Sequence, residues 1–507
     1  MSSETSPLNF RPTSLQWNLE IWRREEARKK DLERGGIFLV LLCFFTFVFA
    51  FVVVPSLDEE SLEPAKMQTR ASAQGDSART TTLDDRVFCG LTIHDAGYVN
   101  LPNKTDYHYA YWYFESRSQP SVDPLVLWLP GGRGYSSLMA LLTANGPCHV
   151  LPDLSTKLNP YSWTNESNVV WLDQPVGVGF TCGDERNADY NEKSVGENIY
   201  YFLQGFFNKH PELAGRELYI MGESYGGDYV LGAAHYVWEQ NKVNVNTPKY
   251  INLKGLALGN SLTQPSIQLP HVIDMAIDNA YNISFVNDSQ LNEMRVAMPI
   301  CTSLLNQCSQ NTRACVQGTD YCTHKLFMPL LAANCNPYDI RIPYKSDDEN
   351  FMYSNLSYVF KYLAAPYVQK SLGMDAKSAN ASHECKSSVY DTFKATARVA
   401  KPVHTYVTDL LNANVRVLVY AGDADLVCNW FGIEAWTRAL QWKGKDEFNA
   451  LRETAFITAN GTNAGMVRSF NNQLTFLRVF NAGHMVLRDQ PTVALAMLNK
   501  FLKNETF

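Results

Sequence analysis

The stretch Glu217-Leu-Tyr-Ile-Met-Gly-Glu-Ser-Tyr-Gly-Gly-Asp228 decides the fold of this 507-residue chain. A short apolar run leads into Gly222-Glu-Ser-Tyr-Gly226, and a helix-compatible segment follows. A serine at the tip of a sharp strand-to-helix turn sits in strained backbone, where flanking glycines remove side chains that would clash. The pentapeptide alone could be a surface turn, but the strand before it and the helix after it favour a nucleophile. Ser224 is the predicted nucleophile.

Similar apolar runs recur along the chain, and the segments 195–207 and 229–239 between them are typical of helices. Near-continuous apolar runs suit strands that are buried on both faces. The repeated βα pattern predicts a mostly parallel sheet with active-site groups at the carboxyl ends of its strands. The runs are Leu125–Leu129, Val169–Leu172, Leu218–Met221, Leu256–Leu258, Val415–Tyr420 and Phe476–Phe480.

A nucleophilic serine needs a general base, and the base needs an orienting carboxylate. His484 follows the last apolar run through a small loop, which places it at the same sheet edge as Ser224. The run ending at Tyr420 leads to Asp423 and Asp425, between which spacing alone does not choose. Either gives the order Ser, Asp, His, which is the order of an α/β-hydrolase.

An oxyanion hole takes one N–H from the residue after the nucleophile, here Tyr225, and another from a loop after an early strand. Leu129-Pro-Gly-Gly-Arg-Gly134 supplies that loop, with Gly131 or Gly132 as the donor. A glycine-rich loop could also bind phosphate. No Gly-Lys-Ser/Thr follows it, so the phosphate-binding alternative is poor.

The amino-terminal part of the chain predicts a membrane anchor. Ile37–Val54 is apolar except for Thr46. Seven Lys or Arg residues precede it, whereas Lys66 is the one Lys or Arg among the fifteen residues that follow it. Its length suits a bilayer span, and the charge asymmetry predicts a cytosolic amino terminus. We therefore expect a cytosolic tail (1–35), a type II signal anchor (36–54), a flexible stalk (55–86) and a folded domain (87–507). A cleaved signal peptide with a long basic region is the alternative.

Eleven cysteines and eight Asn-x-Ser/Thr sequons favour an oxidising, glycosylating lumen, because all the sequons follow the apolar run. The net charge of −7 and the lack of a long basic run beyond residue 34 argue against nucleic acid as a partner. The predicted glycosylation sites are Asn103, Asn165, Asn282, Asn287, Asn355, Asn380, Asn460 and Asn504.

An inserted cap is predicted at about residues 262–400, where strand signals are weak. Inside it Cys301, Cys308, Cys315 and Cys322 are spaced by sevens. Two short antiparallel helices would pair Cys301 with Cys322 and Cys308 with Cys315, the connectivity that closes a simple hairpin. A zinc site is the alternative, but close Cys-x₂-Cys pairs are missing.

Six motifs in order give the chain from about residue 87 to 507 a resemblance to the serine carboxypeptidases, the group of yeast carboxypeptidase Y and cathepsin A. They are Trp128-Leu-Pro-Gly-Gly-Arg-Gly-Tyr-Ser-Ser137, Asn159-Pro-Tyr-Ser-Trp163, Leu172-Asp-Gln-Pro-Val-Gly-Val-Gly-Phe180, Gly222-Glu-Ser-Tyr-Gly-Gly227, Tyr420-Ala-Gly-Asp-Ala-Asp-Leu-Val-Cys-Asn429 and Gly483-His-Met-Val-Leu-Arg-Asp-Gln-Pro491. The resemblance implies Asp425 as the triad acid and Gly132 and Tyr225 as oxyanion donors. It further implies that Cys428 and Met485 line the substrate pocket.

Departures from the family pattern concern the substrate carboxylate. Family members usually have Asn where this chain has Pro130, and a second Glu, the partner of Glu223, where it has Ala144. A lone Glu223 is expected to ionise readily and repel a carboxylate, whereas Arg133 could hold one. Gly131 is also a predicted substrate-binding residue, together with Glu223, Arg133, Cys428 and Met485.

The motif cysteine is also missing, because Tyr135 stands in its place. Its usual partner matches Cys385. That cysteine is therefore expected to be unpaired or bonded to Cys89, Cys148 or Cys182.

The sequence thus predicts an α/β-hydrolase fold with a mostly parallel central sheet and a helical, disulfide-stapled cap, preceded by one transmembrane helix. The predicted function is a lumenal, membrane-anchored serine carboxypeptidase with Ser224, Asp425 and His484 as its triad. No metal or organic cofactor is required, and the expected partners are a peptide or small acyl substrate and the bilayer. An acyltransferase, esterase or amidase on a substrate without a free carboxylate, and a non-catalytic family member, are the alternatives.

Overall fold

The computed structural model describes residues 89, 94–102, 104, 107–132, 134–183, 191–331, 333, 335–343, 357–371 and 400–507. The predicted tail, anchor and stalk, Arg133 and Cys385 lie outside these residues, so the predictions for them stay predictions. Within the described ranges, no helix is both long enough and apolar enough to span a bilayer.

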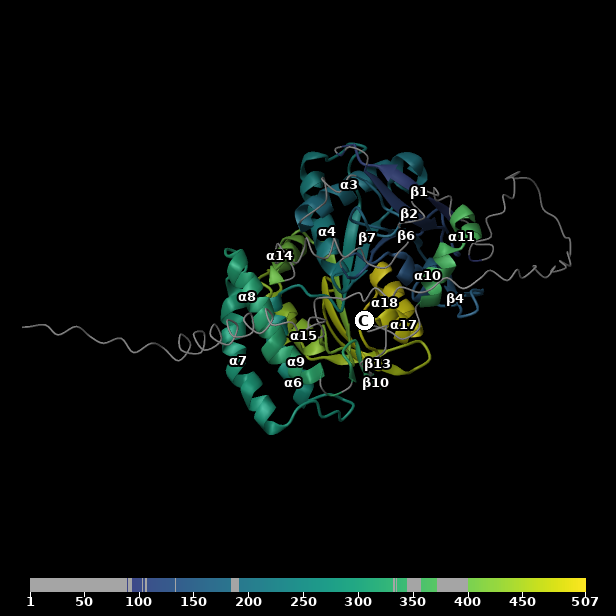
Figure 1. Ribbon diagram of the computed structural model, residues 1–507. Helices are drawn as coiled ribbons and strands as arrows, with labels where there is room; N and C mark the ends of the chain where they lie inside the picture. Colours follow the sequence, from purple (N-terminus) through teal and green to yellow (C-terminus); the bar gives the residue numbers. More distant parts are fainter. Residues whose placement is uncertain are drawn as a thin grey trace, which may run out of the picture. The chain divides into compact units, whose positions relative to one another are not determined.

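A ten-stranded sheet forms the centre of the described fold, in the order β1-β2-β6-β3-β7-β8-β11-β14-β13-β12 (Figure 1). The six inner strands from β6 to β14 run parallel, which confirms the prediction from the apolar runs. The inner strands are β6 (Asn168–Leu172), β3 (Leu125–Leu129), β7 (Leu218–Glu223), β8 (Leu253–Gly259), β11 (Arg416–Gly422) and β14 (Leu474–Val479).

Antiparallel strands extend the sheet at both edges, and the sequence reasoning missed them. Sequences such as HDAGYVN and NAGMVRSF contain no long continuous apolar run, whereas HYAYWYF is apolar and buried over its last six residues. The antiparallel strands are β1 (His94–Asn100), β2 (His108–Phe114), β13 (Asn463–Phe470) and β12 (Thr454–Ile457), of which β1 and β12 form the two edges.

Helices cover both faces of the sheet (Figure 1), and a separate apolar core lies between the sheet and the helices on each face. One face packs against α3 (Glu192–Lys209), α4 (Gly226–Val243), α14 (His404–Asn412) and α15 (Trp430–Ala439). The other packs against α2 (Leu138–Thr143), α10 (Ser357–Ala364), α11 (Pro366–Ser371), α17 (Val486–Asp489) and α18 (Pro491–Leu502). This double cover buries the parallel strands on both sides.

The described parts of the predicted cap are mainly helical and include one short two-stranded sheet. Its helices α7 (Asp288–Asn306) and α8 (Thr312–Cys322) lie side by side (Figure 1) and carry the disulfides Cys301–Cys322 and Cys308–Cys315, the two predicted pairs. Asn287 begins α7 with a capping box, which satisfies backbone N–H groups of its first turn. The other cap elements are α5 (Pro265–Gln268), α6 (Val272–Ile277), α9 (Met328–Leu331), β9 (Cys335–Asn336) and β10 (Asp339–Pro343).

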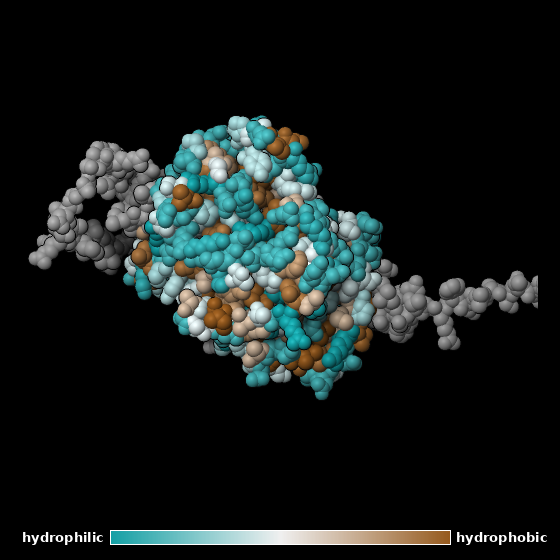
Figure 2. All heavy atoms as spheres, turned by 180° about the vertical axis from the view of Figure 1, so that it is seen from behind, coloured by the Kyte–Doolittle hydropathy of each residue, from teal (hydrophilic) through white to brown (hydrophobic). Residues whose placement is uncertain are grey.

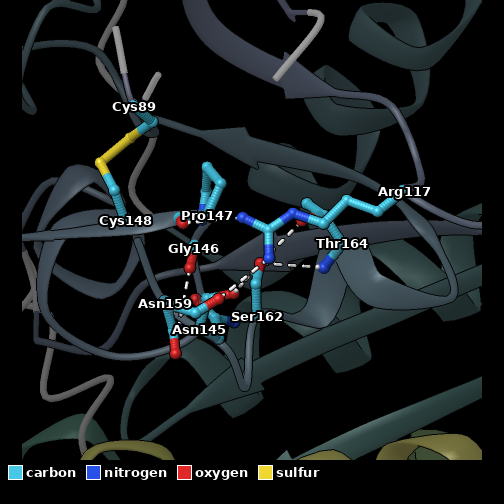
Figure 3. Close-up of a disulfide and its surroundings, with 9 residues drawn as sticks. All are labelled: Cys89, Arg117, Asn145, Gly146, Pro147, Cys148, Asn159, Ser162 and Thr164. Atoms are coloured by element: carbon cyan, nitrogen blue, oxygen red, sulfur yellow. Dashed lines mark hydrogen bonds between the residues drawn. A yellow bond between two sulfur atoms is a disulfide. The ribbon is translucent and has the colours of Figure 1, made fainter. Parts of the chain in front are cut away.

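A third disulfide joins Cys89 to Cys148 in β4 (Cys148–Val150) and spans 59 residues of sequence (Figure 3). Beside it, the Arg117 guanidinium donates to the carbonyl oxygens of Pro147 and Asn159 at 2.8 and 2.9 Å. These contacts tie the start of the described chain to the loop after α2. Because Cys89 and Cys148 form a disulfide with each other, both are excluded as partners of Cys385, which leaves Cys182 of the three that were considered.

Candidate active site

Ser224 lies at the turn between β7 and α4 with φ of 59°, in the left-handed region that non-glycine residues rarely occupy. The glycines around it are required by close approach: a Cβ on Gly226 would lie 2.6 Å from the Pro130 oxygen, and one on Gly222 2.8 Å from the Leu129 oxygen. The Ser224 N–H donates to the Gly259 oxygen at 2.8 Å. The turn is therefore held tightly against β3 and β8.

His484 donates from Nδ1 to Oδ2 of Asp425 at 2.7 Å, and both side chains are almost completely buried. Asn260 donates to the same carboxylate oxygen at 2.7 Å, and the Val427 N–H donates to Oδ1 at 2.9 Å. Asp423 instead accepts from the Tyr281 hydroxyl at 2.5 Å. The structure thus brings Asp425, rather than Asp423, to the imidazole, a choice that sequence spacing left open.

The electrostatics of His484 favour accepting a proton. Burial by itself lowers the pKa of His484, but the charge and hydrogen bond of Asp425 oppose burial, and the pKa is raised above its ordinary value. Nε2 is buried and makes no hydrogen bond to any described residue. The imidazole therefore has one nitrogen fixed by a carboxylate and the other left for a reacting group.

The loop after β3 packs directly against the serine. A Cβ on Gly131 would lie 2.7 Å from the Glu223 oxygen and 2.8 Å from the Ser224 Cβ, and Gly132 has φ of 62°. Tyr225 is the N-cap of α4, so its N–H lies in the helix turn that lacks intrahelical partners. The strand, the loop and the helix therefore bring two backbone segments with N–H groups to Ser224.

Comparisons with known proteins agree with this geometry. A family model described as serine carboxypeptidase matches residues 91–504. The chain belongs to the serine carboxypeptidase family. It is 36% identical over 431 residues to a vacuolar serine-type carboxypeptidase of Saccharomyces cerevisiae, covering 84% of this chain and 82% of that one. The family membership makes it a serine-type carboxypeptidase.

Two further comparisons cover most of the chain. Carboxypeptidase Y homolog A of Sclerotinia sclerotiorum is 37% identical over 413 residues, which are 81% of this chain and 73% of that relative. The crystal structure of a prohormone-processing carboxypeptidase from Saccharomyces cerevisiae has a TM-score of 0.70 at 25% identity, covering 81% of this chain and 91% of that one.

Glu223 of this serine carboxypeptidase differs from the sequence-based expectation. Its side chain is buried, and desolvation raises the pKa of its carboxyl from 4.5 to about 8. The expectation that a lone Glu223 ionises readily is therefore wrong, because desolvation outweighs the opposing charge of His484 and favours the neutral carboxyl. Ala144, at the position of the second acid, is buried among apolar side chains.

Asp173 was missed as a site residue, although the sequence motif contains it. Its buried carboxylate accepts from the Ser136 hydroxyl (2.7 Å), the Ser137 N–H (2.8 Å) and hydroxyl (3.1 Å), and the Phe180 N–H (3.0 Å). These donors belong to the end of the glycine loop and to the segment after β6. Asp173 thus anchors the loop that carries Gly131 and Gly132. The signal in the sequence was the single acidic residue of this motif, directly after the apolar run that ends at Leu172.

Cys428 is buried, and its sulfur lies within 4.8 Å of ligand atoms of Asp425 and His484. Among the residues that the structure describes, the ligand atoms of these three side chains lie close enough together to hold a metal ion. The hydrogen bond between Asp425 and His484 already accounts for two of them, so the cluster needs no metal to explain it. Met485 follows His484 as the N-cap of α17, whereas Arg133 lies outside the described residues.

Proposed function

We propose that this chain is a membrane-anchored, lumenal serine carboxypeptidase that releases C-terminal residues from peptides through an acyl-enzyme on Ser224. The observation that carries the proposal is the buried hydrogen bond from His484 to Asp425, with Nε2 left unbonded among the described residues. A fixed imidazole with one open nitrogen is what a serine nucleophile requires.

In the proposed reaction, Ser224 Oγ attacks the scissile carbonyl carbon while His484 Nε2 takes the hydroxyl proton. The N–H groups of Gly132 and Tyr225 stabilise the resulting oxyanion. The imidazolium then protonates the leaving amine as the C–N bond breaks. A water molecule attacks the ester, gives a proton to His484, and the proton returns to Ser224. Asp425 stays ionised and orients the imidazole throughout.

The neutral Glu223 supports recognition of a C-terminal carboxylate. With its pKa at about 8, the carboxyl is protonated at neutral and acidic pH and offers an O–H donor. Gly131 packs against the Glu223 oxygen and the Ser224 Cβ, and Cys428 and Met485 are proposed to line the substrate pocket. Arg133 is a second candidate contact for the carboxylate.

The anchor and the glycans complete the proposal. Ile37–Val54 is proposed to span the bilayer, with the catalytic domain in the lumen of the secretory or vacuolar system or at the cell surface. The vacuolar name of the yeast relative supports such a compartment. Of the described sequons, Asn282, Asn287, Asn460 and Asn504 are exposed, whereas Asn165 is half-buried and donates its amide to the Pro160 oxygen at 2.8 Å. We therefore expect glycans at the four exposed sites.

The face seen in Figure 2 is compatible with a water-exposed lumenal domain. Hydrophilic residues predominate on it, and hydrophobic residues are scattered in small groups. Membrane attachment is therefore assigned to the amino-terminal run and not to this face.

Peptides of one sequence with a free or an amidated C-terminus test the function. Mass spectrometry of the products should show one C-terminal residue released from the free peptide, and Ser224→Ala should abolish the release. Labelling by a fluorophosphonate, which requires an activated serine, should occur in the wild type and be lost in Ser224→Ala. An unlabelled wild type would establish the non-catalytic alternative.

A second function, hydrolysis or acyl transfer on an ester or amide without a free carboxylate, is favoured by Pro130 and Ala144. Proline has no N–H to donate, and alanine has no polar side chain. Faster cleavage of the amidated peptide or its ester than of the free peptide would support this alternative.

A further inference from the structure

A hairpin of the cap contacts both loops that carry the acid and base. We call residues 335–343, which contain β9 and β10, the cap hairpin. Its Pro337 oxygen accepts from the N–H groups of Leu426 and Val427 at 3.0 and 3.2 Å, directly after Asp425. Its Ile340 N–H donates to the Ala424 oxygen at 3.0 Å. The cap hairpin therefore holds the Asp425 loop from both sides.

The cap hairpin also holds His484 itself. The His484 N–H donates to the Tyr338 oxygen at 2.7 Å, and the two rings are 5.1 Å apart at 68°. Gly483 fits so closely that a Cβ there would lie 2.5 Å from the Tyr338 oxygen and 2.8 Å from the Asp339 Cβ. The Gly483 N–H donates to Oδ2 of Asp489 in α17 at 2.7 Å. The backbone of His484 is thus clamped between the cap hairpin and α17.

One cation connects the two sides of this clamp. Arg341 binds Asp339 through two hydrogen bonds, from Nε at 2.8 Å and from Nη2 at 2.6 Å, and the same Nη2 lies 3.7 Å from Oδ2 of Asp489. The side chains of Asp339 and Asp489 are only 3% and 13% exposed. Two nearly buried carboxylates, one on each side of His484, therefore both lie close to the Arg341 guanidinium, and Arg488 adds a second positive charge near Asp489.

The cap makes one more contact with these loops, through Tyr281. Its hydroxyl donates to Asp423 at 2.5 Å, and the Arg341 guanidinium lies 5.7 Å from the Tyr281 ring centroid. Arg341 therefore sits at the centre of a group that joins the cap to both loops.

We propose that Arg341 is a positioning residue for His484, and that the cap thereby takes part in assembling the acid–base pair. Without the Arg341 guanidinium, Asp339 would lose its bound cation, and Asp489 would keep only the charge of Arg488 against the repulsion from Asp339. Their repulsion would separate the cap hairpin from α17 and displace the backbone on which the imidazole is mounted. The inference rests on the proposed role of His484 as the general base.

Variants of the full-length protein test the proposal. Arg341→Met keeps the length of the side chain and removes the charge, Arg341→Lys restores the charge, and Asp489→Asn keeps an acceptor for the Gly483 N–H. Arg438→Met is the matched control, because Arg438 is a half-exposed arginine whose ion pair with Glu434 is 3.6 Å long. For each we would measure kcat and KM on the free-carboxylate peptide, the fluorophosphonate labelling rate, and Tm.

Arg341→Met is expected to lower kcat and the labelling rate by about 10- to 100-fold with KM changed by less than about threefold, because misplacing a general base affects the transition state and not substrate binding. Arg341→Lys should recover most of the loss, and Arg438→Met should match the wild type. If Arg341 had a merely structural role, its loss would lower the amount of folded enzyme. The folded fraction would not then show a lowered kcat with an unchanged KM.

A folded Arg341→Met enzyme with wild-type kcat would overturn the proposal, and so would a lysine variant as slow as the methionine variant. If Arg341→Met does not fold, the double variant Arg341→Met with Asp489→Asn decides, because it also removes one of the two repelling charges. A folded double variant with kcat and KM near the wild type supports the proposal, and a lowered kcat at unchanged KM overturns it. Failure of the wild type itself to be labelled would refute the proposed function and not the clamp alone.

Discussion

Substitution of Glu223 by glutamine should change how cleavage depends on pH. Burial holds the pKa of this carboxyl at about 8 against an ordinary 4.5, so the neutral donor is present below pH 8 and is lost above it. Above that pH, a carboxylate at position 223 would repel the substrate carboxylate. The amide introduced by Glu223→Gln offers a neutral donor of similar size at every pH.

The magnitude follows from the titration. With a pKa of about 8 the carboxyl is protonated in roughly 3% of molecules at about pH 9.5, so kcat/KM of the wild type on a free-carboxylate peptide should fall about 30-fold from its value near pH 6.5. Glu223→Gln should remove most of this fall. The amidated peptide is the control, because it carries no charge for Glu223 to repel.

Stability gives an independent readout of the same group. A pKa raised by folding means that the stabilising effect of the neutral form is complete below pH 4.5 and is lost as the pH rises to about 8, by on the order of 5 kcal/mol. Urea unfolding should therefore show that the Glu223→Gln variant gains stability relative to the wild type between these pH values. Two kinetic results would refute the reasoning. One is an equal fall of kcat/KM above about pH 8 for the wild type and Glu223→Gln on the free-carboxylate peptide. The other is an equal fall of the wild-type kcat/KM on the amidated peptide.

Three further predictions concern the loop, its anchor and the membrane segment. Gly131→Ala should reduce fluorophosphonate labelling of Ser224 at least about 100-fold, since its Cβ would lie 2.7 Å from the Glu223 oxygen, whereas Gly215→Ala, which would meet nothing within 4 Å, should label normally; equal labelling contradicts the packing. Asp173→Asn should cost about 1.5–3 kcal/mol in urea unfolding and lower kcat, because four donors lose an ionised acceptor; a wild-type midpoint would show that the carboxylate does not anchor the loop. Replacing residues 1–54 by a cleavable signal peptide should release the enzyme from the membrane fraction with unchanged kcat/KM, and retention in carbonate-washed membranes would disprove the anchor.

Sequence patterns predicted the parts of the molecule that depend on local chemistry. Continuous apolar runs identified the parallel strands from β6 to β14, because only strands covered on both faces need no polar alternation. The glycines around Ser224 indicated the elbow, because a close backbone approach excludes any other residue there. The spacing of the four cap cysteines predicted their pairing, because helix periodicity sets which side chains face each other.

The tertiary structure decided what depends on surroundings. Asp423 and Asp425 are two residues apart in one loop, and only the fold shows that Asn260 and His484 bind the second while Tyr281 binds the first. The protonation of Glu223 depends on its burial, which no feature of its own sequence reveals. Arg341 and Asp489 are 148 positions apart, yet they lie on either side of His484. Contacts between segments so distant in sequence are set by packing, and local sequence patterns do not encode them.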